Sequence, residues 1–217
     1  MKAPPPFIAA FDLAGKTGVC DGVAGGVPRF WSWDLFDAGP FRAPRFAMLE
    51  TLLHNYFSET KVDQAYYEAP QPLQVMARIG TTDATMTQLR GYVAVLELTC
   101  FKHKISCAPW EVKDARQMVL GARTFRAMKT TTIDEAGKVK VRKTSGAKPA
   151  VVETCRLLGH AVANDNEGDA VVGWLYQSAR LKPHFSDSMM PLFRGTTDES
   201  IRGTRCDGAA LERQKGS

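Results

Sequence analysis

The sequence predicts an α/β protein whose mixed sheet carries helices on both faces. The sequence of residues 7–36 contains three short patterns typical of extended strands. In residues 44–180, patterns typical of helices alternate with patterns typical of strands. The composition is that of a globular protein. Of 217 residues, 44% are hydrophobic and 24% are charged. No apolar run approaches the roughly 20 residues needed to span a bilayer, so we expect no membrane partner.

Three strands are expected near the N-terminus. Residues 7–13 are apolar apart from Asp12, and residues 17–24 form a second extended stretch. In residues 29–36, large apolar side chains alternate with other residues, directly after the Gly25-Gly26 turn. Alternation on both sides of a glycine turn is typical of a β-hairpin, so the three strands should form an antiparallel meander.

Helices and strands then alternate. Apolar spacing predicts helices at 44–58, 82–103, 109–120, 149–159 and 166–180, and short strands at 62–68 and 105–108. The helix 109–120 is expected to carry Pro109 in its first turn. Residues 122–147 break this pattern and suggest a basic β-hairpin inserted between two helices. We expect one domain over 1–182 and a flexible C-terminal tail over 183–217, which lacks periodicity.

Positive charge is concentrated in one segment. Residues 102–148 hold 12 Lys and Arg against 4 Asp and Glu, a net charge of +8, although the whole chain carries only +5. Such density suits a phosphate backbone, and a solvated basic loop is the alternative on charge alone. The five cysteines are an odd number without a close pair. They predict no disulfide framework and favour a reducing cytoplasm.

Three carboxylates stand where apolar residues would be expected. Asp12 interrupts the first strand, Glu68 ends the fourth, and Asp169 opens the last helix. If the first and fourth strands are parallel neighbours, Asp12 and Glu68 face the same crevice, and a docked helix can bring Asp169 there. Carboxylates that share a site repel one another, and hard cations such as Mg²⁺ relieve this. Two such ions about 4 Å apart would promote in-line phosphodiester hydrolysis.

Six motifs in order resemble the RuvC-type Holliday junction resolvases of the RNase H-like superfamily, in particular its divergent phage and bacterial members. The resemblance covers about residues 7–176, and each motif alone is weak. The motifs are FDLAGKTGVC with Asp12, YYEAP with Glu68, TQLRGYVAVLE with Gln88, Arg90 and Gly91, PWEVKDARQMVLG with Val112, Lys113 and Gly121, GAKPAVVETCRLLG with Lys148, and NDNEGDAVVGWLY with Asp169.

The resemblance implies an RNase H-like fold with a mixed five-stranded sheet, and a metal-dependent endonuclease that resolves branched DNA. It implies Asp12, Glu68 and Asp169 as catalytic metal ligands for two Mg²⁺ ions, with Mn²⁺ able to substitute. Cleavage would leave a 5′-phosphate and a 3′-hydroxyl. A four-way junction has two-fold symmetry, so a homodimer is expected, with helix 82–103 at its interface. The DNA-binding side chains would be Arg90, Lys113, Lys138, Lys140, Arg142, Lys143 and Lys148.

Two departures from the family pattern change these expectations. Asn166 stands where the family usually has an Asp, sometimes a His, three residues before its last Asp. Asp165 lies on nearly the same helical face as Asp169, so we expect Asp165 as the fourth catalytic ligand, with Asn166 as the alternative. The family's aromatic residue after the catalytic Glu is also missing. Leu73 or Met76 would then act as the apolar wedge that opens the junction.

Other functions remain open from the sequence. Another RNase H-like nuclease, acting on flaps, RNA–DNA hybrids or packaged DNA, would have the same acidic site. A DNA-binding protein of this fold without catalysis is the second alternative, because Asn166 departs from the pattern. A small ATPase is the third, although the chain is too short for the two lobes of that class, so we expect no nucleotide cofactor. The resemblance implies the cytoplasm of a bacterial cell or of a phage-infected host.

Overall fold

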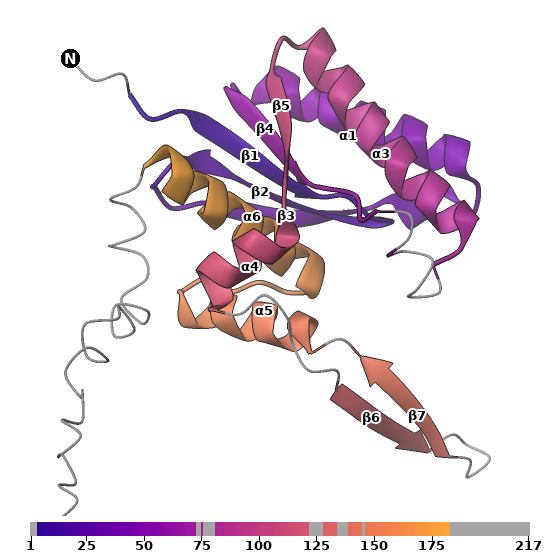
Figure 1. Ribbon diagram of the computed structural model, residues 1–217. Coiled ribbons are helices and arrows are strands. Elements are labelled where there is room, and N and C mark those ends of the chain that lie inside the picture. The colour runs from indigo at the N-terminus through magenta and orange to yellow at the C-terminus, as the bar shows by residue number, and fades with distance from the viewer. Residues whose placement is uncertain are drawn as a thin grey trace, which may run out of the picture.

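The computed structural model describes residues 4–72, 75, 81–121, 128–133, 139–144 and 146–182. A five-stranded sheet in the order β3-β2-β1-β4-β5 lies between two layers of helices (Figure 1). The strands are β1 (Phe7–Asp12), β2 (Lys16–Val23), β3 (Arg29–Asp34), β4 (Gln64–Glu68) and β5 (Ser106–Trp110). The predicted mixed α/β sheet is confirmed.

The sheet is mixed because two kinds of connection build it. Short turns join β1, β2 and β3 into the predicted antiparallel meander. Helical crossovers bring β4 and β5 back parallel, with β4 beside β1 and β5 beside β4. The C-terminal ends of the parallel neighbours β1 and β4 therefore lie next to each other.

Two hydrophobic cores fill the spaces between the sheet and its helices. The helices α1 (Arg42–Glu59) and α3 (Asp83–Lys102) cover one face, and a short 3₁₀ helix (Leu35–Ala38) precedes α1. The helices α4 (Val112–Leu120), α5 (Ala147–Leu157) and α6 (Asp165–Leu181) cover the other face. Strand β1 serves both cores, because its successive side chains alternate between the two faces.

The prediction that Pro109 opens a helix is wrong. Pro109 pairs with Tyr67 as the fourth residue of β5, and α4 begins only at Val112. Proline lacks a backbone N–H and is tolerated in an edge strand, which is where β5 lies. The backbone N–H of Ala69 donates to the carbonyl of Trp110 at 2.8 Å, which continues the pairing beyond Pro109.

Strands β6 (Met128–Ile133) and β7 (Val139–Thr144) pair antiparallel as a separate two-stranded sheet beyond α5 (Figure 1). They lie within the segment expected to form the inserted basic hairpin, whose role remains a proposal. The expected tail, residues 183–217, lies outside the described residues. None of the helices described here is long and apolar enough to cross a membrane.

Candidate active site

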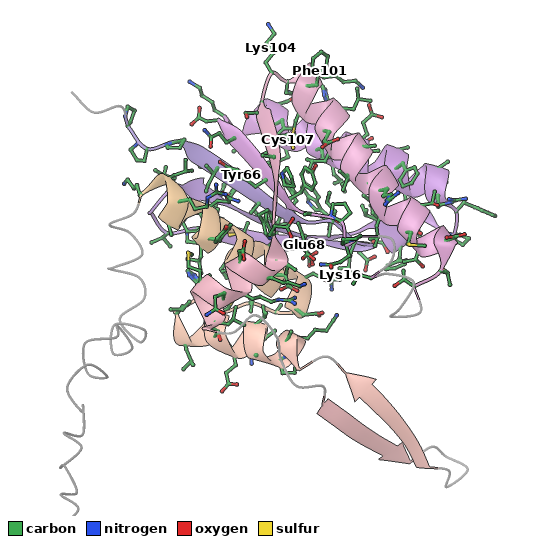
Figure 2. All side chains as sticks on the ribbon, viewed as in Figure 1. Lys16, Tyr66, Glu68, Phe101, Lys104 and Cys107 are labelled. Carbon is green, nitrogen blue, oxygen red and sulfur yellow. The ribbon has the colours of Figure 1, made fainter. Side chains whose placement is uncertain are left out.

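Strand alternation directs Asp12 and Glu68 to the same face of the sheet. In β1, Ile8 and Ala10 pack into the core beneath α6, so Asp12, two residues further on, continues that row. In β4, Tyr66 packs against the same core, and Glu68 follows it by two. Because Phe11 pairs with Tyr67 in the parallel ladder, Asp12 and Glu68 occupy adjacent positions at the strand ends. Figure 2 shows Glu68 at the end of its strand, close to α4.

Helix α6 can approach the two carboxylates because the residue of β2 beside Asp12 is a glycine, which has no side chain. Gly18 pairs with Asp12 across β1 and β2. A Cβ atom built on Gly18 would overlap the carbonyl group of Asn166 and would lie 3.1 Å from the backbone nitrogen of Glu167. The absence of a side chain at Gly18 therefore lets the first turn of α6 rest on the sheet beside Asp12.

The start of α6 is anchored by hydrogen bonds. The Asn164 side chain caps the helix by accepting from the backbone N–H of Glu167 at 3.0 Å. The buried Glu167 carboxylate in turn accepts from the N–H of Ala163 at 2.8 Å and from the hydroxyl of Ser32 at 3.1 Å. Glu167 thus points toward β3 and away from Asp12, as its position two residues before Asp169 predicts.

These segments enclose a cavity of about 320 Å³. Every sequence-predicted ligand lines it: Asp12, Glu68, Asp165, Asn166 and Asp169. The apolar part of the lining comes from α3 and from the residues that follow β1 and β4, with Leu13, Pro70, Met86, Leu89 and Val93. The cavity therefore combines oxygen-bearing and apolar side chains in one lining.

The carboxylates disturb one another's protonation. Burial raises the pKa of Asp12 well above its ordinary value, and the charges of Glu68, Asp169 and Asp165 raise it further. Burial, followed by the charge of Asp169, raises the pKa of Glu68 to about 7. Burial also raises the pKa of Asp169, although Arg116 opposes the shift. Burial and mutual repulsion thus disfavour the ionised forms of these carboxyl groups.

Two basic side chains balance part of this charge. The Arg116 Nη2 atom lies 3.1 Å from the Asp169 Oδ1 atom, and the Lys148 ammonium pairs with the Asp165 carboxylate. Within the described residues, no group of three or more His, Cys, Asp or Glu side chains is arranged to hold a metal ion. The donor set nevertheless fits a hard cation, because it offers only oxygen atoms whose negative charges repel one another.

The other predicted residues fall into three groups. Arg90 lines the cavity together with Lys148. Lys113 is exposed on α4 and is not among the cavity-lining residues. The remaining predicted residues lie in β7, where only the backbone is described, or outside the described residues altogether: Lys140, Arg142 and Lys143 in the first case, and Leu73, Met76 and Lys138 in the second.

Sequence reasoning missed two residues that shape the site. Gly18 sets the approach of α6, and Arg116 pairs with Asp169. A signal for Arg116 exists, because the buried positions Val112, Ala115 and Val119 of α4 leave Arg116 at the border of the buried stripe. A basic residue at that border can turn toward the core side of the helix.

Sequence comparison identifies no relative, because no protein-family model and no curated protein matches the chain significantly. Comparison of structures does. Thermus thermophilus RuvC superposes with a TM-score of 0.56 at 10% identity, over 82% of this chain and 95% of that chain. T. thermophilus RuvC in complex with a Holliday junction substrate gives 0.56 at 10% identity, over 83% and 97%. The yeast mitochondrial Holliday junction resolvase gives 0.47 at 9% identity, over 88% and 86%.

At this level of identity the likeness is one of fold, and the fold assignment rests on the two matches to the T. thermophilus protein. They cover most of both chains, so the likeness extends over most of the chain. The chain therefore has an RNase H-like fold, and its structure resembles that of the RuvC Holliday junction resolvases.

Proposed function

We propose that the chain is a metal-dependent endodeoxyribonuclease that cuts branched DNA, with the four-way junction as its expected substrate. The observation that carries the proposal is the convergence of Asp12, Glu68 and Asp169 from three separate segments in one cavity. The fold supports the substrate class, because a structurally similar protein was solved in complex with a Holliday junction substrate.

Asp12, Glu68 and Asp169 would hold the divalent ions, Mg²⁺ or Mn²⁺, with Asp165 or Asn166 as a further oxygen ligand. Bound ions would activate water and stabilise the charge that develops on the displaced phosphodiester oxygen. The carboxylates must be ionised to bind metal. Burial and, after it, mutual repulsion raise the pKa of Asp12 and Glu68, and a bound cation would offset both effects.

The surrounding residues suit a nucleic-acid strand. Arg90 and Lys148 line the cavity and would contact phosphate oxygens on either side of the cut bond. The apolar wall formed by Met86, Leu89 and Val93 would keep bulk water from the reacting phosphate, which strengthens every charge interaction there. The wedge role of Leu73 or Met76 remains part of the proposal.

The basic segment is proposed as a DNA-gripping arm. It contains the β6–β7 hairpin, and its sequence carries Lys138, Lys140, Arg142 and Lys143. Lys113 on α4 is exposed and would add a further phosphate contact. Contacts of this kind neutralise phosphates and release counterions, so they raise affinity without reading sequence.

We further propose a homodimer, because a four-way junction presents two equivalent strands for cleavage. The α3 surface supports this interface, since Leu98 is 52% exposed and Phe101 is 80% exposed on that helix. A dimer would bury these two exposed apolar side chains of each protomer, and apolar side chains of this kind are typical of the core of an interface. Light scattering of the purified protein tests the dimer, and Phe101→Glu should convert it to a monomer.

The proposed function is tested with a labelled four-way junction, a matched linear duplex and a flap. Symmetric nicking of the junction alone, lost in EDTA and in Asp12→Asn, would establish a junction resolvase. Cleavage of all three substrates would instead indicate a broader branched-DNA nuclease. Tight binding without cleavage in Mg²⁺ or Mn²⁺ would overturn the catalytic proposal and leave a DNA-binding protein of this fold.

A further inference from the structure

Arg116 is the least solvated cation that contacts the carboxylate cluster in the described structure. Its guanidinium lies 3.1 Å from Asp169, and the two side chains are only 21% and 13% exposed. The Lys148–Asp165 pair is more open, at 56% and 28%. Since water screens the second pair more strongly, Arg116 carries the larger share of the internal neutralisation.

Arg116 acts on more than its direct partner. Its positive charge lowers the pKa of Asp169, and it lowers the pKa of Glu68 as well. One guanidinium therefore offsets two of the three carboxylates proposed to hold metal. A divalent ion bound directly to these carboxylate oxygens would offset the same negative charges from a shorter distance.

The Arg116 side chain is also incompletely satisfied where it lies. Its Nε atom is buried and has no hydrogen-bond partner in the described part of the chain. An arginine can offer two parallel donors to one anion, but Arg116 makes one hydrogen bond to Asp169, through Nη2. The observed contact therefore uses only part of the binding capacity of this group, which lines a cavity of about 320 Å³.

We propose that Arg116 and a divalent cation exchange at Asp169, so that metal binding releases the guanidinium toward a substrate phosphate. Two positive groups cannot share the Asp169 carboxylate closely without repulsion, and a phosphate offers Arg116 the paired acceptors that Asp169 does not. The inference rests on the proposed function. It gives Arg116 a positioning role before DNA binds and a phosphate-binding role afterwards.

Exchange has a measurable consequence in the absence of DNA. Arg116 competes with the metal, so its removal should tighten metal binding by the free protein. We expect Arg116→Gln to bind Mn²⁺ about tenfold more tightly than the wild type in calorimetry, at a pH of about 8 where the carboxylates can ionise. Arg116→Lys keeps the charge and should remain close to the wild type.

Lys113→Gln is the matched control for metal affinity. It removes the same charge from the same helix at an exposed position outside the cavity lining, so Mn²⁺ affinity should stay unchanged. Equal affinities for the wild type and a folded Arg116→Gln would overturn the exchange while leaving the nuclease proposal intact. A wild type that neither binds Mn²⁺ nor cuts DNA would overturn both.

A second measurement does not depend on any variant. In wild-type protein labelled with ¹⁵N at arginine, titration with Mg²⁺ should shift the Arg116 Nε–H resonance strongly. The reason is that the surroundings of the guanidinium change when the metal ion replaces it at the Asp169 carboxylate. Arg29 serves as the internal reference, since its guanidinium is held by Asp21 through two hydrogen bonds. Metal binding that leaves the Arg116 resonance unmoved would contradict the exchange.

Discussion

Gly18 on β2 lies directly against the backbone of Asn166 in the first turn of α6, without room for a Cβ atom between them. Because Gly18 also pairs with Asp12, this contact sets the start of α6 directly against the strand beside Asp12. The site thus depends on a residue that contributes no chemistry.

We expect Gly18→Ala to abolish the proposed cleavage. The added methyl group would overlap the Asn166 carbonyl, and backbone cannot rotate aside as a side chain can. The start of α6 must then move away from the sheet and take Asp165 and Asp169 with it. The melting temperature should fall by several degrees, since overpacking costs about 1–3 kcal/mol. Nicking assays and thermal unfolding measure the two effects.

Gly26→Ala is the control for this substitution. Gly26 lies in the turn between β2 and β3, and its Cβ would approach the Val23 carbonyl to 3.1 Å, without contact with α6. Cleavage by Gly26→Ala should match the wild type. A folded Gly18→Ala protein with wild-type cleavage would show that the position of α6 is not essential.

Asp12→Asn should separate activity from stability. Asn replaces a carboxyl whose ionised form is disfavoured first by burial and then by the charges of the neighbouring carboxylates, so the metal-free variant should melt roughly 3–6 °C above the wild type at neutral pH. Cleavage should fall by about a thousandfold or more, because a central metal ligand is lost. Asp37→Asn at an exposed position should change neither quantity. A destabilised Asp12→Asn protein would argue for a structural role of this carboxylate.

The stability of the metal-free protein should decrease as the pH rises from about 5 to about 8. Burial and Asp169 raise the pKa of Glu68 to about 7, so the folded state binds more protons than the unfolded state across this interval. Folding is then favoured at the acidic end, and this advantage disappears above the folded-state pKa. Chemical denaturation in EDTA at several pH values measures the slope.

The difference between the wild type and Glu68→Gln isolates this effect. Burial lowers the pKa of His160, so His160 contributes a dependence of the opposite sign that both proteins share. Glu68→Gln should therefore lose part of the decrease seen in the wild type, whereas Glu59→Gln at an exposed position should not. Identical curves for the wild type and Glu68→Gln would contradict the raised pKa.

Much of the fold could be predicted because local patterns and tertiary structure agree. The apolar run of β1 and the helical spacing of α3 are both properties of neighbouring residues, and both elements form where expected. Pro109 is the exception, since a helix start and an edge strand both tolerate proline. Only the position of β5 at the border of the sheet decides between them.

The candidate site was only partly predictable. Asp12, Glu68 and Asp169 stand out because each interrupts an apolar segment. The place of Arg116 at the border of the buried stripe of α4 is a local signal, but its pairing with Asp169 depends on how α4 packs beside α6, and its long side chain can reach in several directions. Gly18 lies within the FDLAGKTGVC motif, but its role could not be predicted locally, because that role arises from a helix that begins more than a hundred residues later.

A buried charge network on the opposite face should support stability alone. Asp21 is fully buried and accepts a hydrogen bond from the Tyr56 hydroxyl at 2.8 Å, in addition to those from Arg29. Tyr56→Phe removes one partner of a buried carboxylate and should destabilise the protein by about 1–3 kcal/mol. Cleavage by the folded variant should stay at the wild-type rate. A strong loss of cleavage would connect this network to the active site.

The basic hairpin should govern the salt dependence of DNA binding. Replacement of Lys138, Lys140, Arg142 and Lys143 by Gln should weaken junction binding at moderate salt. It should also flatten the plot of log affinity against log salt by about 0.9 for each phosphate that the arm no longer neutralises. The chemistry at Asp12 should survive, so cleavage at saturating protein should remain near the wild-type rate. Fluorescence anisotropy at several salt concentrations gives the slope. An unchanged slope would mean that the positive charge of this segment faces solvent and that the arm does not hold DNA.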